Sequence, residues 1–244
     1  MKFKRGLIII GLAFIVSVVV WLAIPSPTSN VVVHVAKVAV DEVEGRIEDK
    51  TSDRVSPPSG KSPNLITLEE ACQKQGILFP PRNLYIVVDK SEFKLYLYSD
   101  DELVKTYPVS LGSNPVDDKV KLRDRCTPEG EFYICQKIGD PDKIFLGSRW
   151  MRLSYPNKED AARGLANGLI DQATARAINE AIDGQKTPPQ NTPLGGGIGI
   201  HGGSYDRNWT MVTTWTAGCI ALYNPDIKEF YDYVPVGTRV LVRR

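Results

Sequence analysis

Histidine and cysteine are scarce in this chain, which has two histidines and four cysteines among 244 residues. No C-x-x-C or H-x-x-x-H spacing occurs, so the sequence does not support a zinc site, and we expect neither a metal nor a cofactor. Lysine and arginine number 30 against 29 aspartates and glutamates, and no basic stripe is present. Nucleic-acid-binding proteins carry such a stripe, so the composition argues against a nucleic-acid partner.

One long apolar segment lies near the N-terminus. Leu7–Ile24 holds 18 residues without a charge, which is long enough to span a bilayer. Lys2, Lys4 and Arg5 precede it and are expected to stay in the cytoplasm. We therefore predict that residues 1–24 form an uncleaved signal anchor in the cytoplasmic membrane, with the rest of the chain outside. A cleaved signal peptide is the alternative, although an A-x-A cleavage site is missing.

Polar, proline-containing sequence follows this segment and predicts a tether over residues 25–82. The valine-rich patch Val31–Val40 within it is compatible with either a strand or a helix. A capping box at Thr67-Leu68-Glu69-Glu70 predicts a short helix that ends near Gly76. We place the catalytic domain after this tether, at residues 83–243.

The pattern of this domain is mainly β with short helices, an α+β class. Aromatic and branched residues at Leu84–Val88 and Phe93–Tyr98 flank Lys90-Ser91-Glu92 and predict a β-hairpin. Further strands are expected at residues 105–110, 131–134 and 238–242. Two short helices are expected between Asn157 and Asp183, as scaffold rather than as a wall of a substrate groove. One more helix is expected from 225 to about 233, capped by Asn224-Pro225-Asp226.

Two short segments, each rich in glycine, carry the best candidates for chemistry. Cys219 lies in Thr214–Leu222, and His201 lies in Ile198–Gly203. A thiol attacks a carbonyl when a base converts it to a thiolate and backbone N–H groups receive the oxyanion. Gly218 allows the backbone to turn tightly just before the thiol. A small buried hydrophobe and a hydrogen-bonded core histidine are the alternatives when each residue is taken alone.

The two segments together resemble the catalytic signature of the YkuD-type L,D-transpeptidases, which cross-link or remodel bacterial peptidoglycan. In that family an I-x-I-H-G segment is followed by a [ST]-x-G-C-[IV] segment, and here residues 202–218 separate His201 from Cys219. Other motifs occur in the family's order, namely Asn83–Lys90, Lys94–Tyr98, Val109–Gly112, Cys126–Tyr133 and Pro235–Val240. The resemblance implies a β-sandwich catalytic domain with cysteine-dependent acyl transfer.

The resemblance also implies roles for individual residues. Cys219 would attack the carbonyl of the third residue of a peptidoglycan stem peptide and expel the terminal D-amino acid. His201 would be the base, oriented by the backbone carbonyl of Gly202. The amides of Gly218 and Cys219 are the expected oxyanion donors. An amine from a neighbouring stem or another acceptor would then take the acyl group.

Four residues between or beside the motifs are candidates to line the stem-peptide groove. They are Tyr205, Trp209, Trp215 and Thr216, and for each of them packing in the core or a loop is an equal alternative.

The chain departs from many members of the family at two positions. Those members have histidine two residues before the nucleophile and arginine two residues after it, whereas this chain has Ala217 and Ala221. The W-T-x-G-C-I-A-L form resembles one branch of the family. His201 is then the only imidazole available as base.

Three classes of function are compatible with the sequence. The first is an L,D-transpeptidase of cell wall biogenesis and cell shape, which we expect. The second is a hydrolase that uses water as acceptor to trim stems or to cut protein–wall bonds. The third is a wall-binding module without activity. The expected partners are peptidoglycan stem peptides and, through residues 7–24, the cytoplasmic membrane.

An exported chain is able to form disulfides. Cys126 and Cys135 bracket a Thr-Pro-Glu-Gly turn and are the natural pair, with Cys72 and Cys219 left reduced. Whether their side chains face each other is a question of geometry.

Overall fold

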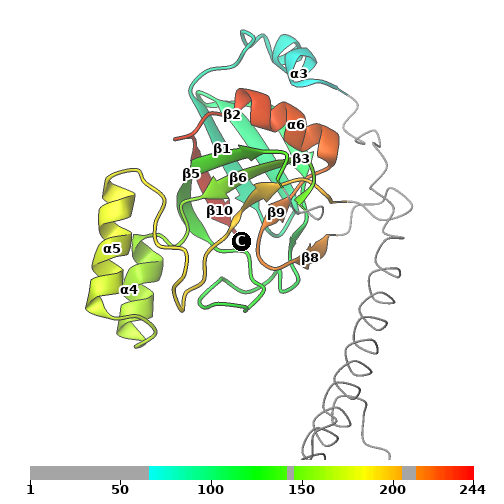
Figure 1. Ribbon diagram of the computed structural model, residues 1–244. Coiled ribbons are helices and arrows are strands. Elements are labelled where there is room, and N and C mark those ends of the chain that lie inside the picture. Colours follow the sequence, from blue (N-terminus) through cyan, green and yellow to red (C-terminus); the bar gives the residue numbers. More distant parts are fainter. Residues whose placement is uncertain (1–65, 142–145, 205–212) are drawn as a thin grey trace, which may run out of the picture. The chain divides into compact units, whose positions relative to one another are not determined.

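One curled sheet of eight strands carries the fold (Figure 1). The computed structural model describes residues 66–141, 146–204 and 213–244, all of them in the unit Ser56–Arg244. The strands of this sheet are β1 (Leu84–Asp89), β2 (Lys94–Ser99), β3 (Glu102–Pro108), β5 (Gly130–Gly139), β6 (Arg149–Leu153), β7 (Gly199–His201), β9 (Ile220–Ala221) and β10 (Arg239–Arg243). Their order is β3-β2-β1-β10-β5-β6-β7-β9. The mainly β prediction is confirmed, and the strands of the expected β-sandwich form one continuous curled sheet.

The length of β5 explains how a single sheet curls. The first part of β5 pairs with β10, and its second part pairs with β6. The register shifts between Ile134 and Gln136, which is where the strand bends from one partner to the other. Beyond the end of β3, Ser110 bridges to Ala221 of β9, so the curl brings the last strand close to the segment that follows the first.

The predicted hairpin is present as β1 and β2, which pair antiparallel from Leu84↔Ser99 to Asp89↔Lys94. The Tyr85 and Tyr98 rings stack across the two strands at 4.7 Å. A separate two-stranded parallel sheet joins β4 (Leu111–Gly112) to β8 (Thr214–Thr216), the strand that leads into the Cys219 segment.

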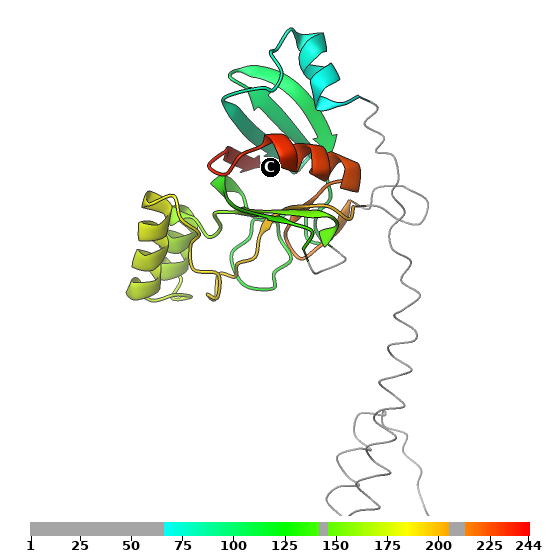
Figure 2. The same cartoon turned by 45° about the horizontal axis from the view of Figure 1, so that its top comes forward.

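Two helices bury their apolar faces in the main core. Helix α3 (Leu68–Gln75) begins with the predicted Thr67 capping box and ends at Gly76. Helix α6 (Asn224–Tyr233) packs the Phe230 ring edge-on against Tyr107 of β3 at 5.6 Å. Figure 2 shows α6 between the β1–β3 half of the sheet and the β6–β9 half.

The start of α6 corrects one prediction. Its N-cap is Tyr223, and no side chain caps its first turn. The Asn224 side chain turns away from the helix, and its Oδ1 accepts a hydrogen bond from Gly203 N at 3.1 Å. The residue expected to cap the helix therefore holds the segment that follows His201.

The two predicted helices of the insertion are confirmed as α4 (Lys158–Ala166) and α5 (Gln172–Asp183), capped by Asn157 and Asp171. They lie side by side in Figure 1. A small core of their own holds them together, made of Ala161, Ile170, Ala175, Ile178 and Leu194. Leu194 belongs to the glycine-rich segment that leads to His201, so the insertion supports that segment.

The cysteine prediction is wrong in its pairing, because all four cysteines are free. Cys126 is buried and its Sγ donates to the Asp124 carbonyl at 3.4 Å. Cys135 lies at the bend of β5, where its thiol contacts Thr187. The two sulfurs contact different neighbours, so their proximity in sequence across a turn does not lead to a disulfide.

The predicted anchor and most of the tether, residues 1–65, lie outside the described residues. Within the described ranges, no helix is both long and apolar enough to cross a membrane.

Candidate active site

Strand register brings Cys219 and His201 to one face of the sheet. Strands β7 and β9 run parallel with Ile200 opposite Ile220 and His201 opposite Ala221. One residue earlier, this register sets Cys219 beside Gly199, whose backbone contacts the thiol. Alternate residues of a strand share a face, so His201 and Cys219 lie on the same side, one strand and two residues apart.

His201 is buried, and its protonation state follows from its surroundings. Nδ1 lies 2.6 Å from the Gly202 carbonyl oxygen, the contact that the resemblance implied. A carbonyl only accepts, so Nδ1 carries the proton and Nε2 keeps its lone pair. Burial lowers the pKa of His201 to about 4, although the Gly202 bond acts in the opposite direction. The imidazole is therefore neutral at physiological pH.

Two indole rings enclose this imidazole. Trp150 of β6 stands opposite His201 in the antiparallel register and stacks on it at 5.8 Å and 22°. Trp215 meets the ring edge-on at 5.7 Å and 84°. Neither indole N–H has a hydrogen-bond partner among the described residues. Trp215 was predicted from sequence as a lining residue, whereas Trp150 was missed, because only strand pairing reveals its place.

The thiol of Cys219 is also neutral. The residue is half-buried, and Sγ donates to the Gly197 carbonyl at 3.4 Å. Burial raises the pKa of Cys219 to about 11, although the Gly199 backbone bond and the positive charges of Lys119 and Arg152 lower it. The pair is thus a thiol and an imidazole at rest, and not a thiolate–imidazolium ion pair.

The pH dependence of alkylation tests this resting state. We expect the rate of Cys219 modification by iodoacetamide to rise steadily with pH through the neutral range, because the thiolate fraction grows up to a pKa of about 11. Peptide mapping by mass spectrometry follows Cys219 separately from Cys135 in the same sample. A rate that stays constant from about pH 5 to pH 8 would show a preformed thiolate instead.

Thr216 organises the turn that presents the thiol. Its Oγ1 accepts from Gly218 N at 3.1 Å and donates to the Cys219 carbonyl at 2.7 Å. The side chain is buried, so its hydroxyl serves the turn and does not support a place in the substrate groove. Because the Gly218 amide bonds to Thr216 here, the oxyanion role of Gly218 and Cys219 remains a prediction.

Position 218 requires glycine for two reasons, its backbone conformation and the close approach of another backbone. Its φ is +131°, and a Cβ there would lie 2.5 Å from the Cys126 carbonyl oxygen. We expect Gly218→Ala to lower the free energy of unfolding by about 3 kcal/mol or more, from backbone strain and overlap together. Gly237→Ala is the matched control, since φ is +91° there and a Cβ would meet nothing within 4 Å. Chemical denaturation of both variants measures the difference, and equal losses would contradict the steric argument.

The carbonyl that orients His201 is fixed from two sides. Gly202 N donates to the Leu146 carbonyl at 2.9 Å. A Cβ on Gly202 would lie 2.3 Å from Asn224 Oδ1, so only glycine fits between β7 and α6. Asn224 is a second residue whose contact with the site was not predicted from the sequence. Its place before Pro225 indicated a helix cap instead.

The two positions that depart from the family pattern have different surroundings. Ala221 is buried, and its backbone exchanges two 2.8 Å hydrogen bonds with Ser110. Ala217 is exposed in the turn that precedes Cys219. Two predicted lining residues, Tyr205 and Trp209, lie outside the described residues.

Nowhere in the described ranges do three His, Cys, Asp or Glu side chains gather as metal ligands would.

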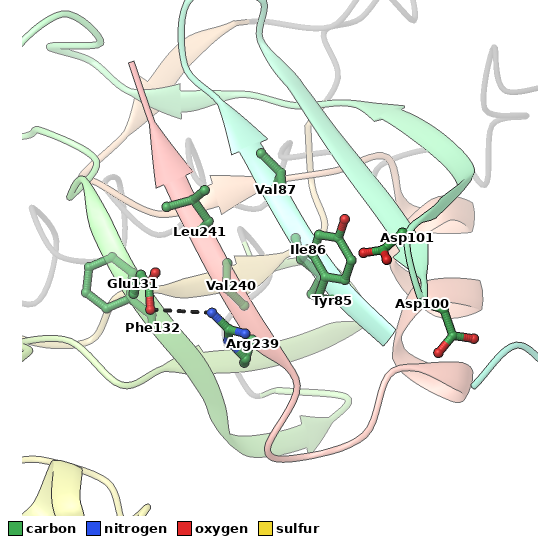
Figure 3. A pocket seen from close by; sticks show the side chains of 10 residues that line it. All are labelled: Tyr85, Ile86, Val87, Asp100, Asp101, Glu131, Phe132, Arg239, Val240 and Leu241. Atoms are coloured by element: carbon green, nitrogen blue, oxygen red, sulfur yellow. Dashed lines mark ion pairs between the residues drawn. The ribbon is translucent and has the colours of Figure 1, made fainter. Parts of the chain in front are cut away.

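A hollow of about 420 Å³ elsewhere on the sheet is separate from this site (Figure 3). It lies over β1, β10 and β5, where exposed Arg239 and Glu131 pair at 3.6 Å. Neither Cys219 nor His201 lines it, so the candidate chemistry is not placed there.

The candidate active site therefore consists of a neutral thiol and a neutral imidazole oriented by Gly202, both on one face of a curled sheet. These are the groups that cysteine acyl chemistry would use. The chain belongs to the YkuD family, the L,D-transpeptidase catalytic domain, whose model matches residues 83–242.

Curated relatives with similar sequences are named as L,D-transpeptidases. The putative L,D-transpeptidase YqjB of Bacillus subtilis is 26% identical over 162 residues, which cover 66% of this chain and 72% of that protein. The putative L,D-transpeptidase YkuD of Bacillus licheniformis is 27% identical over 157 residues, 64% of each chain. Among solved structures, the helical cell shape determining protein Pgp2 from Campylobacter jejuni is 22% identical with a TM-score of 0.45. That alignment covers 68% of this chain and 49%, about half, of Pgp2.

Proposed function

We propose that this protein is a peptidoglycan L,D-transpeptidase that acts through a thioester on Cys219. The observation that carries the proposal is the shared face of Cys219 and His201, with Nδ1 of His201 held by Gly202 O and Nε2 left to accept a proton. The substrate is a stem peptide, and the bond broken is the amide between its third residue and the terminal D-amino acid.

The neutral resting state sets the order of proton transfers. As Sγ attacks the scissile carbonyl carbon, its proton passes to His201 Nε2, and the carbonyl oxygen takes the negative charge. The tetrahedral intermediate then collapses, the C–N bond breaks, and the imidazolium gives its proton to the leaving amine. The products of this half-reaction are the thioester and the free D-amino acid.

The low pKa of His201 suits the second of these steps. An imidazole with a pKa of about 4 is a weak base, but its protonated form is a strong acid. Expulsion of an amine needs a strong acid, because an unprotonated amine anion is a very poor leaving group. The hydrophobic enclosure by Trp150 and Trp215 therefore favours breakdown of the intermediate towards the thioester.

In the second half-reaction an acceptor amine attacks the thioester carbonyl. Neutral His201 takes the amine proton, the C–S bond breaks, and Cys219 regains a proton as the new amide forms. The contact of Sγ with the Gly197 carbonyl supports transfer, since the glycine-rich segment covers one side of the thiol.

Export through Leu7–Ile24 would bring the domain to the wall on the outer side of the cytoplasmic membrane.

Hydrolysis is the second candidate, because Ala217 beside the nucleophile turn is small and exposed and leaves water access. The two reactions share the thioester and differ only in the acceptor. Supplying disaccharide tetrapeptide with an excess of a different D-amino acid separates them by mass analysis of the products. Exchanged tetrapeptide supports transfer, whereas tripeptide alone at every amine concentration would make the protein a carboxypeptidase or amidase.

A further inference from the structure

A row of residues crosses three strands and leads to Cys219, which immediately precedes β9. Gln136 of β5 stands opposite Arg152 of β6, and Arg152 stands opposite Gly199 of β7. The parallel register of β7 and β9 continues this row to Cys219. Because Gly199 has no side chain, Arg152 is the next side chain along the row from the thiol.

Arg152 is half-buried and held by neutral partners. Its Nε donates to Gln136 Oε1 at 2.9 Å, and its Nη1 donates to Gln190 Oε1 at 2.8 Å. The guanidinium also lies 5.7 Å from the centre of the Trp150 ring, the same ring that stacks on His201. No carboxylate among the described residues pairs with it. Lys119, the other cation that acts on Cys219, is in contrast neutralised by Asp124 at 2.7 Å.

The Gln190 side chain connects the Arg152 guanidinium to the segment that contacts Cys219. Gln190 Oε1 accepts from Gly197 N at 2.8 Å as well as from Arg152, and Gly197 O accepts from Cys219 Sγ. Gln190 Nε2 is fixed in turn by the carbonyls of Tyr155 and Pro188. Arg152 is thus set in a defined place relative to the thiol before any ligand arrives.

A guanidinium is always charged and has five N–H donors in a planar fork, which matches a carboxylate. Only two of these donors have partners among the described residues. A half-buried charge without a counter-ion is costly, so its presence beside the Cys219 thiol indicates that an anionic ligand pairs with it. Ala221, two residues after Cys219, supplies no charge.

We propose that Arg152 is the carboxylate-binding residue of the substrate site. The ligand is a carboxylate of the stem peptide, either the terminal carboxylate of the leaving D-amino acid or a side-chain carboxylate on the third residue. Two strand spacings of about 4.8 Å separate the Arg152 and Cys219 backbones. One residue of the peptide spans about 3.8 Å of this separation of roughly 10 Å, and the Cys219 and Arg152 side chains cover the remainder when the scissile carbonyl lies at the thiol and the carboxylate at the guanidinium. This subsite rests on the proposed function for the identity of its peptide.

Calorimetric titration of the full chain tests the subsite without turnover. The parent is Cys219→Ala, and the ligands are the tetrapeptide with both carboxylates free, with the terminal one amidated, and with the side-chain one amidated. Amidation at one position is expected to weaken binding to the parent by at least about tenfold. Adding Arg152→Gln should weaken binding of the free acid to a similar degree and remove the sensitivity to that amidation. The sensitive position identifies which carboxylate is bound.

Arg149→Gln is the matched control, since Arg149 lies on the same strand but faces the other side and pairs with Asp140 at 2.9 Å. It should leave the amidation effect intact. Arg152→Lys keeps the charge without the fork and should retain part of the effect, which covers the case that Arg152→Gln does not fold. Undiminished sensitivity in Arg152→Gln, or none in the parent, would overturn the subsite. Turnover of the same peptides by the unmodified protein is scored separately, so failure of catalysis and failure of the subsite are distinguishable.

Discussion

Cys219→Ala is expected to reduce turnover of stem tetrapeptide by about 10⁴-fold or more, because Cys219 is the only thiol of the described residues that lies on the face of His201. The side chain is small and half-buried, so the fold should be retained. Steady-state rates with a disaccharide tetrapeptide, together with thermal melting curves, measure both effects.

Cys135→Ala is the matched control for this prediction. Cys135 is also a free, half-buried thiol, but it lies at the bend of β5 and not in the row that ends at Cys219. Its removal should leave activity near that of the unmodified protein. Comparable activity in Cys219→Ala and Cys135→Ala would reject the nucleophile assignment.

His201→Gln is expected to lower turnover by about 10²- to 10⁴-fold, the usual contribution of a positioned acid–base group. His201 is the only histidine among the described residues, and position 217, where many members of the family have a second one, is alanine. The glutamine variant keeps a polar side chain beside Trp150 and loses only the ability to take and return the proton. Single-turnover rates of thioester formation measure this loss directly.

The pH profile of the unmodified protein is a second check on His201. Neutral imidazole is the competent form, and its pKa is about 4, so the single-turnover rate of thioester formation, a step without an acceptor amine, should persist as the pH falls from 7 to 5 and be lost only near pH 4. The sign follows from burial, which disfavours the imidazolium and so moves the acid limb to lower pH. An acid limb between about pH 6 and 7, the range of an exposed histidine, would contradict the enclosed base.

The candidate nucleophile and base were readable from sequence because each lies in a short, glycine-marked segment. The hairpin, three helix starts and the last strand were readable for a similar reason, since alternation and capping residues are local signals. Trp150 and Arg152 carry no such signal. They join the site only because the register of β6 against β7 sets them opposite His201 and Gly199.

Two errors show where local signals mislead. Asn224 precedes a proline in a pattern typical of a helix cap, yet a tertiary contact with Gly203 takes its side chain. Cys126 and Cys135 flank a turn, yet β5 bends at Cys135 to change partners and the thiols stay free. In both cases a contact between segments distant in the sequence determined the structure, and the residue pattern within each segment did not predict that contact.

In the proposed reaction, Cys219 holds the substrate as a thioester. Intact-protein mass spectrometry of the unmodified chain, quenched in acid during turnover of tetrapeptide, tests it directly. We expect a mass increase equal to the donor peptide less its terminal D-amino acid, located on Cys219 by peptide mapping and absent from Cys219→Ala. An adduct on another residue, or turnover that persists in Cys219→Ala, would contradict the claim.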